Sequence, residues 1–76
     1  MYEIRKVNLE KIKNLRKEKK ITLQEMSRFL GYESPNGYHY IEKGRIKISA
    51  EVLAQVADIL KVPIDALFLN RNHQNG

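Results

Sequence analysis

The chain has 76 residues and a mass of 8.9 kDa, and its formal net charge at pH 7 is +5. This length allows one domain with one small core, and because the sequence has no cysteine, disulfides and thiolate metal sites are excluded. Apolar runs are only a few residues long, far short of the roughly 20 residues of a membrane-spanning helix, so we expect a soluble cytoplasmic protein with no membrane partner.

Positive charge is concentrated in the first two-thirds of the chain. Residues 1–47 hold 12 of the 14 Lys and Arg residues but only 6 of the 9 Asp and Glu residues. This asymmetry is typical of proteins that bind nucleic acid or an acidic membrane face. A surface that only keeps the protein soluble would show the same charge. The choice between an anionic partner and a solubilising surface therefore depends on the elements that carry the charge.

The first predicted elements are an N-terminal arm and a basic helix. Residues 1–8 alternate only weakly between apolar and polar types, and we expect a free or loosely packed arm rather than a strand. Asn8 is a suitable N-cap for a helix over residues 9–20. The apolar residues of this helix recur at helical spacing: Leu9, Ile12 and Leu15.

A second, short helix is predicted over residues 23–30. Thr22 and Glu25 stand three residues apart and form the capping-box pattern that starts a helix. Gly31 follows the last apolar residue and is suited to the left-handed conformation that ends one. A tight turn at this glycine leads to the next helix, which is the outline of a helix-turn-helix.

The third helix is predicted over residues 35–43. Ser34 is a candidate N-cap, and Pro35 fits the first helical position because its missing N–H is not needed there. Tyr38 lies three residues before an isoleucine and is expected in the core. Gly44 then ends the helix.

The C-terminal part is predicted to hold two more helices and a tail. Ser49 caps a strongly amphipathic helix over residues 50–60, and Pro63 opens a last helical turn or two in PIDALFL. The folded domain is therefore expected to span residues 9–69. The segment 70–76 has no apolar residue and is predicted to be disordered.

Five short motifs stand in a fixed order along these elements: LRKEK, TLQEM, LG, IEKG and VPIDALF. From Leu9 to Phe68 the chain thereby resembles the Xre-type, phage-repressor-like helix-turn-helix family. The resemblance implies an all-α, five-helix, lambda-repressor-like domain. It also implies a transcriptional regulator, a repressor or an activator, that inserts its third helix into the major groove of double-stranded DNA as a homodimer.

The resemblance places the residues that face DNA in and around the third helix: Ser34, Pro35, Asn36, Gly37, His39, Tyr40 and Lys43. Asn36 is the best candidate for reading a base, because an amide can bond adenine at two atoms. Tyr40 offers a hydroxyl or packs its ring on a thymine methyl, and His39 meets a phosphate. Pro35 and Gly37 have no side-chain donor and are expected to allow close approach.

Phosphate contacts are expected from Lys43, Arg45 and Lys47, which strengthen binding without choosing sequence. One position departs from the family pattern. Many members have glutamine directly after the capping threonine, where it holds a phosphate, but this chain has Leu23 there. Gln24 follows and is expected to reach the DNA backbone instead.

A second departure is one extra residue in the turn, near Glu33. The resemblance further implies that Glu42 pairs with Arg16 and ties the third helix to the first, although a plain surface charge is the alternative. Tyr32 lies in the turn and is expected to cover the core.

The C-terminal apolar cluster is expected to form the dimer interface through Leu67, Phe68 and Leu69, unless these residues only close the core. No cofactor, metal or small-molecule ligand is expected, since the only histidine besides His39 lies in the tail and the chain has no cysteine. The serines read as caps and a helix residue, so we do not expect an enzyme. The alternatives are an antitoxin or accessory interaction module, whose DNA binding is secondary, and non-specific binding to an anionic surface.

Overall fold

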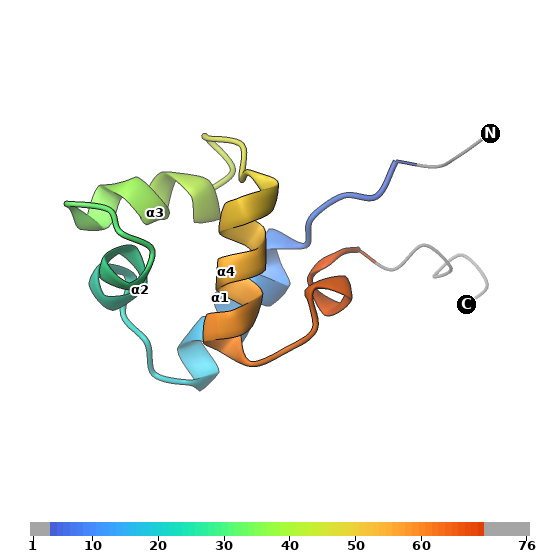
Figure 1. The fold of residues 1–76 in the computed structure, drawn as a ribbon, viewed down its shortest axis with the longest axis horizontal. Helices are drawn as coiled ribbons and strands as arrows, with labels where there is room; N and C mark the ends of the chain where they lie inside the picture. The colour runs from blue at the N-terminus through green and yellow to red at the C-terminus, as the bar shows by residue number, and fades with distance from the viewer. Residues whose placement is uncertain (1–3, 70–76) are drawn as a thin grey trace.

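The computed structural model describes residues 4–69 (Figure 1). The expected disordered tail at 70–76 and the first three residues of the expected arm lie outside this range. The described chain forms four α-helices and one 3-10 helix: α1 (Leu9–Glu18), α2 (Leu23–Phe29), α3 (Pro35–Glu42), α4 (Ala50–Leu60) and η1 (Ile64–Leu67). The all-α prediction is confirmed, because residues 4–69 contain no strand beyond one isolated bridge. None of the described helices is long and apolar enough to cross a membrane.

Helices α2 and α3 each end one residue earlier than predicted, and the first and fifth predicted helices differ more from the observed ones. The fifth helix is a four-residue 3-10 turn, Ile64–Leu67, rather than an α-helix. The first helix ends at Glu18, two residues early, because Lys20 adopts a left-handed conformation with φ of 60°. The sequence offers no glycine at this point, so the early end could not be read from it.

Three of the four expected N-caps are made. Asn8 and Ser49 each accept a hydrogen bond from a backbone N–H in the first turn of their helices. Thr22 and Glu25 form the complete capping box, with bonds of 3.0 and 2.9 Å. Ser34 occupies the N-cap position of α3 as predicted, but its side chain makes no capping bond.

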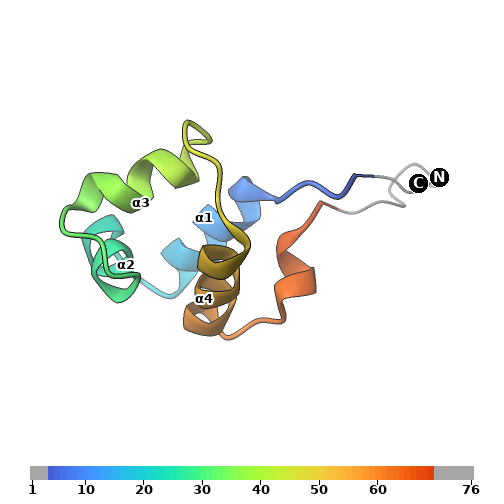
Figure 2. The ribbon, with the colours of Figure 1, turned by 45° about the horizontal axis from the view of Figure 1, so that its top comes forward.

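The helices enclose one small core. α2 and α3 pack against each other at one end of the molecule, α1 and α4 cross beside them, and η1 lies on the far side of α4 (Figures 1 and 2). The largest side chains that are almost fully buried come from every element: Ile12, Met26, Tyr38, Val56, Leu60 and Leu67. Each helix therefore contributes to the same core, which fixes the position of α3.

The N-terminal segment pairs with the C-terminal end of the described chain (Figure 2). The backbone N–H of Asn8 donates to the carbonyl of Leu67 at 2.7 Å, and the N–H of Leu69 donates to the carbonyl of Lys6 at 2.8 Å. The expectation of a free or loosely packed arm is therefore wrong for the last residues of the segment 1–8. The pairing partner is about 60 residues away in the sequence, so local alternation could not reveal it.

Side-chain contacts reinforce this pairing, and burial distinguishes the residues that were expected at the dimer interface. The Nη1 atom of Arg5 lies 3.1 Å from Oδ1 of Asp65, and its guanidinium lies 4.7 Å from the centre of the Phe68 ring. Leu67 has an exposed fraction of 0%. It closes the core and cannot contact a partner in this conformation, which corrects its predicted place in a dimer interface. Leu69 is 45% exposed and is therefore accessible to a partner.

Candidate nucleic-acid interface

Helix α3 has one buried face and one open face. Tyr38 and Ile41 are 1% and 4% exposed and point into the domain, as predicted for Tyr38. Because α3 lies at the edge of the molecule (Figure 1), its other face is open to solvent. Five residues predicted to face DNA are exposed along and just before this helix: Ser34, Pro35, Asn36, Tyr40 and Lys43.

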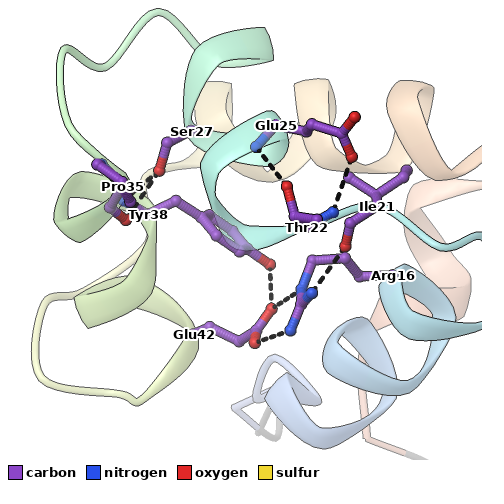
Figure 3. A network of polar contacts seen from close by, with 8 residues as sticks. All are labelled: Arg16, Ile21, Thr22, Glu25, Ser27, Pro35, Tyr38 and Glu42. Atoms are coloured by element: carbon purple, nitrogen blue, oxygen red, sulfur yellow. Dashed lines mark hydrogen bonds and ion pairs between the residues drawn. The ribbon is translucent and has the colours of Figure 1, made fainter.

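A network of hydrogen bonds holds the buried face of α3 to α1 (Figure 3). The Nε and Nη2 atoms of Arg16 each donate to one carboxylate oxygen of Glu42, both at 2.9 Å. The remaining Nη1 donates to the carbonyl of Ile21 at 2.8 Å, and the Tyr38 hydroxyl donates to Glu42 at 2.7 Å. The pairing of Arg16 with Glu42 is thereby confirmed, and it also ties both helices to the start of α2.

The environment of this network shifts the pKa of each member. Burial alone raises the pKa of Glu42, but the hydrogen bonds from Arg16 and Tyr38 and the positive charge of Arg16 outweigh it and lower the pKa below its ordinary value of 4.5. The hydrogen bond to Glu42 raises the pKa of Arg16 against the effect of burial. Burial, followed by the bond to Glu42, raises the pKa of Tyr38 well above its ordinary range. The pair is therefore ionised and the tyrosine neutral at physiological pH.

The start of α3 is bonded by a residue of α2. The hydroxyl of Ser27 donates to the carbonyl of Pro35 at 3.0 Å and accepts from the backbone N–H of Tyr38 at 3.2 Å. Ser27 is only 1% exposed, so both bonds are made inside the domain (Figure 3). The sequence pattern predicts the cap at Ser34 and an ordinary helix position at Ser27. The structure gives the bonding role to Ser27 and leaves Ser34 at the surface.

Gly37 has a packing role that the sequence did not reveal. A Cβ atom at this position would lie 2.7 Å from Cγ and 2.8 Å from Cβ of Tyr32, distances at which something must shift. The glycine therefore lets α3 approach the turn residue Tyr32, which covers the core as expected. Close approach to Tyr32 is thus a role that Gly37 has in addition to its predicted close approach to DNA, which stays a prediction.

A basic hollow of about 400 Å³ lies between α1, the start of α2 and the end of α3. His39 of α3 and Lys43 directly after it line the hollow on one side. Lys13 and Lys17 line it from α1 together with Glu10, so lysines predominate. The two α1 lysines are not among the DNA-binding residues that the family resemblance predicts. The alternation of basic residues on the polar arc of α1 was the available signal, but only the fold shows that this arc continues to α3.

Leu23 and Gln24 lie in different surroundings at the start of α2. Leu23 lines the basic hollow, where its apolar side chain cannot hold a phosphate. Gln24 is exposed and borders a small depression of about 100 Å³ beside Ser34 and Pro35. Its amide is therefore placed next to the start of α3, on the same side as the residues predicted to face DNA.

The end of α3 continues the exposed basic surface. Tyr40 is 39% exposed, and its ring is stacked with that of His39 at 6.2 Å and lies 6.0 Å from the guanidinium of Arg45. The backbone N–H of Arg45 donates to the carbonyl of Tyr40 at 2.9 Å, which fixes the path of the chain after α3. Lys43, Arg45 and Lys47 are all exposed along that path.

Comparison with known families agrees with this geometry. The family model described as helix-turn-helix, HTH_3, matches residues 12–67, which is more than half of the chain. None of the curated proteins matches the chain. The match covers the whole of α2 and α3, the network that positions them and the exposed face of α3. The chain therefore belongs to the Xre/lambda-repressor-like family of DNA-binding helix-turn-helix domains.

Proposed function

We propose that the protein is a sequence-specific transcriptional regulator that inserts α3 into the major groove of double-stranded DNA. The observation that carries this proposal is the arrangement of α3 itself. The Arg16–Glu42 pair and Tyr38 hold one face against the domain, while the opposite face exposes Asn36 and Tyr40. A helix held in this way presents a defined set of side chains to base edges.

Base reading is assigned to the first turns of α3. Asn36 is exposed there, and its amide can bond the N6 and N7 atoms of adenine together. Ser34 makes no capping bond, so its hydroxyl is available to a base or a phosphate. Tyr40 lies one turn further along the same face and supplies a ring edge or hydroxyl to the next base pair.

Phosphate binding is assigned to basic residues on both sides of α3. Lys43, Arg45 and Lys47 follow the helix, and Lys13 and Lys17 reach the other side from α1. DNA carries one phosphate charge per about 1.7 Å of its axis, so a helix that enters the groove meets phosphates on both flanks. These contacts position the domain, while Asn36 and its neighbours choose the sequence.

We further propose that the regulator acts as a homodimer on a two-fold site. Ile64 and Leu69 are 41% and 45% exposed. Ile64 belongs to η1, which lies on the opposite side of α4 from α3 (Figure 1), and Leu69 is the second residue after η1. Phe68 is partly buried under Arg5 and borders this surface. A contact through these residues leaves α3 of each copy free for DNA.

Selection of bound sequences from a random DNA pool tests the proposal. We expect enrichment of one motif that is repeated as a palindrome, with half-site centres about 10 base pairs or a multiple of that distance apart. A single unrepeated motif would contradict the dimer but keep the specific regulator. Binding without any enriched motif would contradict sequence-specific recognition by α3.

A further inference from the structure

A second hollow lies between the N-terminal segment and the loop that joins α3 to α4. Its volume is about 480 Å³. Its walls hold six aliphatic side chains: Ile4, Val7, Leu9, Ile41, Ile46 and Ile48. We call this hollow the isoleucine groove. It is separate from the basic hollow in its position and in its apolar character, although Leu9 lies between the two.

Much of the apolar surface of the isoleucine groove is open to water. Ile4 is 85% exposed and Ile46 is 49% exposed, whereas Ile41 is 4% exposed and forms the floor. The open side chains thus continue directly from the hydrophobic core. Contiguous exposed apolar surface of this kind is typical of interaction sites in small soluble domains.

The charged residues of the isoleucine groove are all basic. Arg5, Lys6 and Lys47 stand among its walls, and no acidic residue is among the described residues that line it. Arg5 is partly neutralised by its pair with Asp65, whereas neither lysine forms an ion pair with another residue in the range 4–69. The groove therefore combines a hydrophobic floor with positive charge at its edge.

The hydrophobic floor and the basic edge together indicate the chemistry of the ligand that would fit the groove. Apolar side chains would cover Ile4 and Ile46, and carboxylates would meet Lys6 and Lys47. A second copy of this chain is not the occupant, because the proposed homodimer contact uses Ile64 and Leu69, which do not line the groove. A DNA backbone would satisfy the lysines but leave the isoleucines uncovered. We propose that the isoleucine groove binds an acidic amphipathic segment of a partner protein.

The groove shares Lys47 with the phosphate-binding surface proposed above. An acidic segment in the groove therefore competes with DNA for this side chain and for the loop that carries it. Binding of the partner lowers the affinity for DNA, which makes the groove a control point. This consequence rests on the proposed function, whereas peptide binding in the groove does not.

Two labelled peptides test the inference on the full chain by fluorescence anisotropy. One is an amphipathic peptide of about 15 residues built from Leu, Ala and Glu, and the other has Lys in place of every Glu. We expect the Glu peptide to bind at least about tenfold more tightly than the Lys peptide. The double variant Ile4→Ser/Ile46→Ser should weaken the Glu peptide by a similar factor. Lys6→Glu should reduce the difference in affinity between the Glu peptide and the Lys peptide.

The matched control is Phe29→Ser, which removes an apolar side chain that is 51% exposed on α2, outside the groove. This variant should bind the Glu peptide like the unchanged protein, and circular dichroism should show that all variants keep their helices. Equal binding of the two peptides, or an unchanged affinity in the Ile4→Ser/Ile46→Ser variant, would overturn the inference.

DNA binding of the same variants separates the two proposals. Ile4→Ser/Ile46→Ser should keep its affinity for a selected DNA duplex, because neither isoleucine is assigned a contact with DNA. If this variant instead loses DNA affinity by tenfold or about that factor and peptide binding is unchanged, the groove belongs to the DNA interface and the inference is wrong. If the Glu peptide binds as expected while no DNA motif is enriched, the inference about the groove is supported and the proposed function is contradicted.

Discussion

Arg16 and Glu42 meet side by side, with two parallel hydrogen bonds of 2.9 Å between the guanidinium and the carboxylate. They belong to α1 and α3, and their side chains are only 7% and 6% exposed. The bidentate geometry fixes both the distance between the helices and the rotation of α3. The same rotation that turns Glu42 inward turns Asn36 and Tyr40 outward, so the pair sets the surface that α3 presents.

Replacement of Glu42 by glutamine should destabilise the fold strongly. Glu42→Gln leaves the Arg16 guanidinium buried without its counter-charge, and loss of one partner of a buried pair costs about 3–5 kcal/mol. Urea unfolding followed by circular dichroism measures the change in the free energy of unfolding. Glu18→Gln, at an exposed position of α1, is the control and should change this free energy by less than about 0.5 kcal/mol.

The network should also make stability fall in acid. The pKa of Glu42 is lower in the folded chain than its ordinary value of 4.5, so the folded state holds fewer protons than the unfolded state in this range. Its contribution to stability is therefore complete above pH 4.5 and is lost as the pH falls through the lowered pKa. Urea unfolding from about pH 7 to about pH 2 should show this decrease, and Glu42→Gln should lack this part of it. An identical acid dependence in both proteins would contradict the assignment.

Gly37→Ala should destabilise the protein even though alanine favours helices. The intrinsic gain is about 1 kcal/mol, but the new methyl group would lie 2.7 Å from Cγ of Tyr32. Overpacking of this kind costs typically 1–3 kcal/mol, about as much as the gain or more, so a lower thermal midpoint is expected. Asn36→Ala, one residue earlier at an exposed position, is the control and should keep the midpoint. A midpoint raised by Gly37→Ala would show that Tyr32 moves aside easily.

Asn36→Ala and Lys47→Ala should affect DNA binding in different ways. Loss of the Asn36 amide should cost about 1–3 kcal/mol on the selected site and relax the preference at one base pair. Loss of the Lys47 charge should weaken all sequences alike and lower the salt slope by about one unit. Anisotropy titrations on the selected site and on single-base variants distinguish the two. Gln55→Ala, which removes an exposed amide on α4, is the control and should change neither the base preference nor the salt slope. Similar behaviour of Asn36→Ala and Lys47→Ala would refute base reading by Asn36.

The two lysines of α1 should contribute phosphate contacts of their own. Because Lys13 and Lys17 line the basic hollow beside His39 and Lys43, the double variant Lys13→Gln/Lys17→Gln should lower the salt slope by about two units while the preferred motif stays the same. Titrations at several salt concentrations measure the slope. Lys61→Gln, at the end of α4, is the control: it removes one positive charge outside the basic hollow and should leave the salt slope unchanged. An unchanged slope in the double variant would place α1 away from the DNA.

The sequence by itself determined the local structure of this protein and the segregation of its charge. The capping box of Thr22 and Glu25, the caps at Asn8 and Ser49, and the periodic apolar residues predicted four helices within two residues of their observed ends. These features depend on residues three or four apart, so a linear sequence contains them directly. The ordered motifs indicated the family, which the family-model match confirms, and the resemblance implied the Arg16–Glu42 pair, which the structure confirms.

Only the tertiary structure decided how these elements meet. It gave the bonding role at α3 to Ser27 rather than Ser34, placed Gly37 against Tyr32, and buried Leu67. It also joined the N-terminal segment to residues near the C-terminus and so built the isoleucine groove. Each of these outcomes depends on the direction of a side chain toward an element that is distant in the sequence. Periodicity and capping patterns are local and carry no information on such directions, which are fixed when the single core closes.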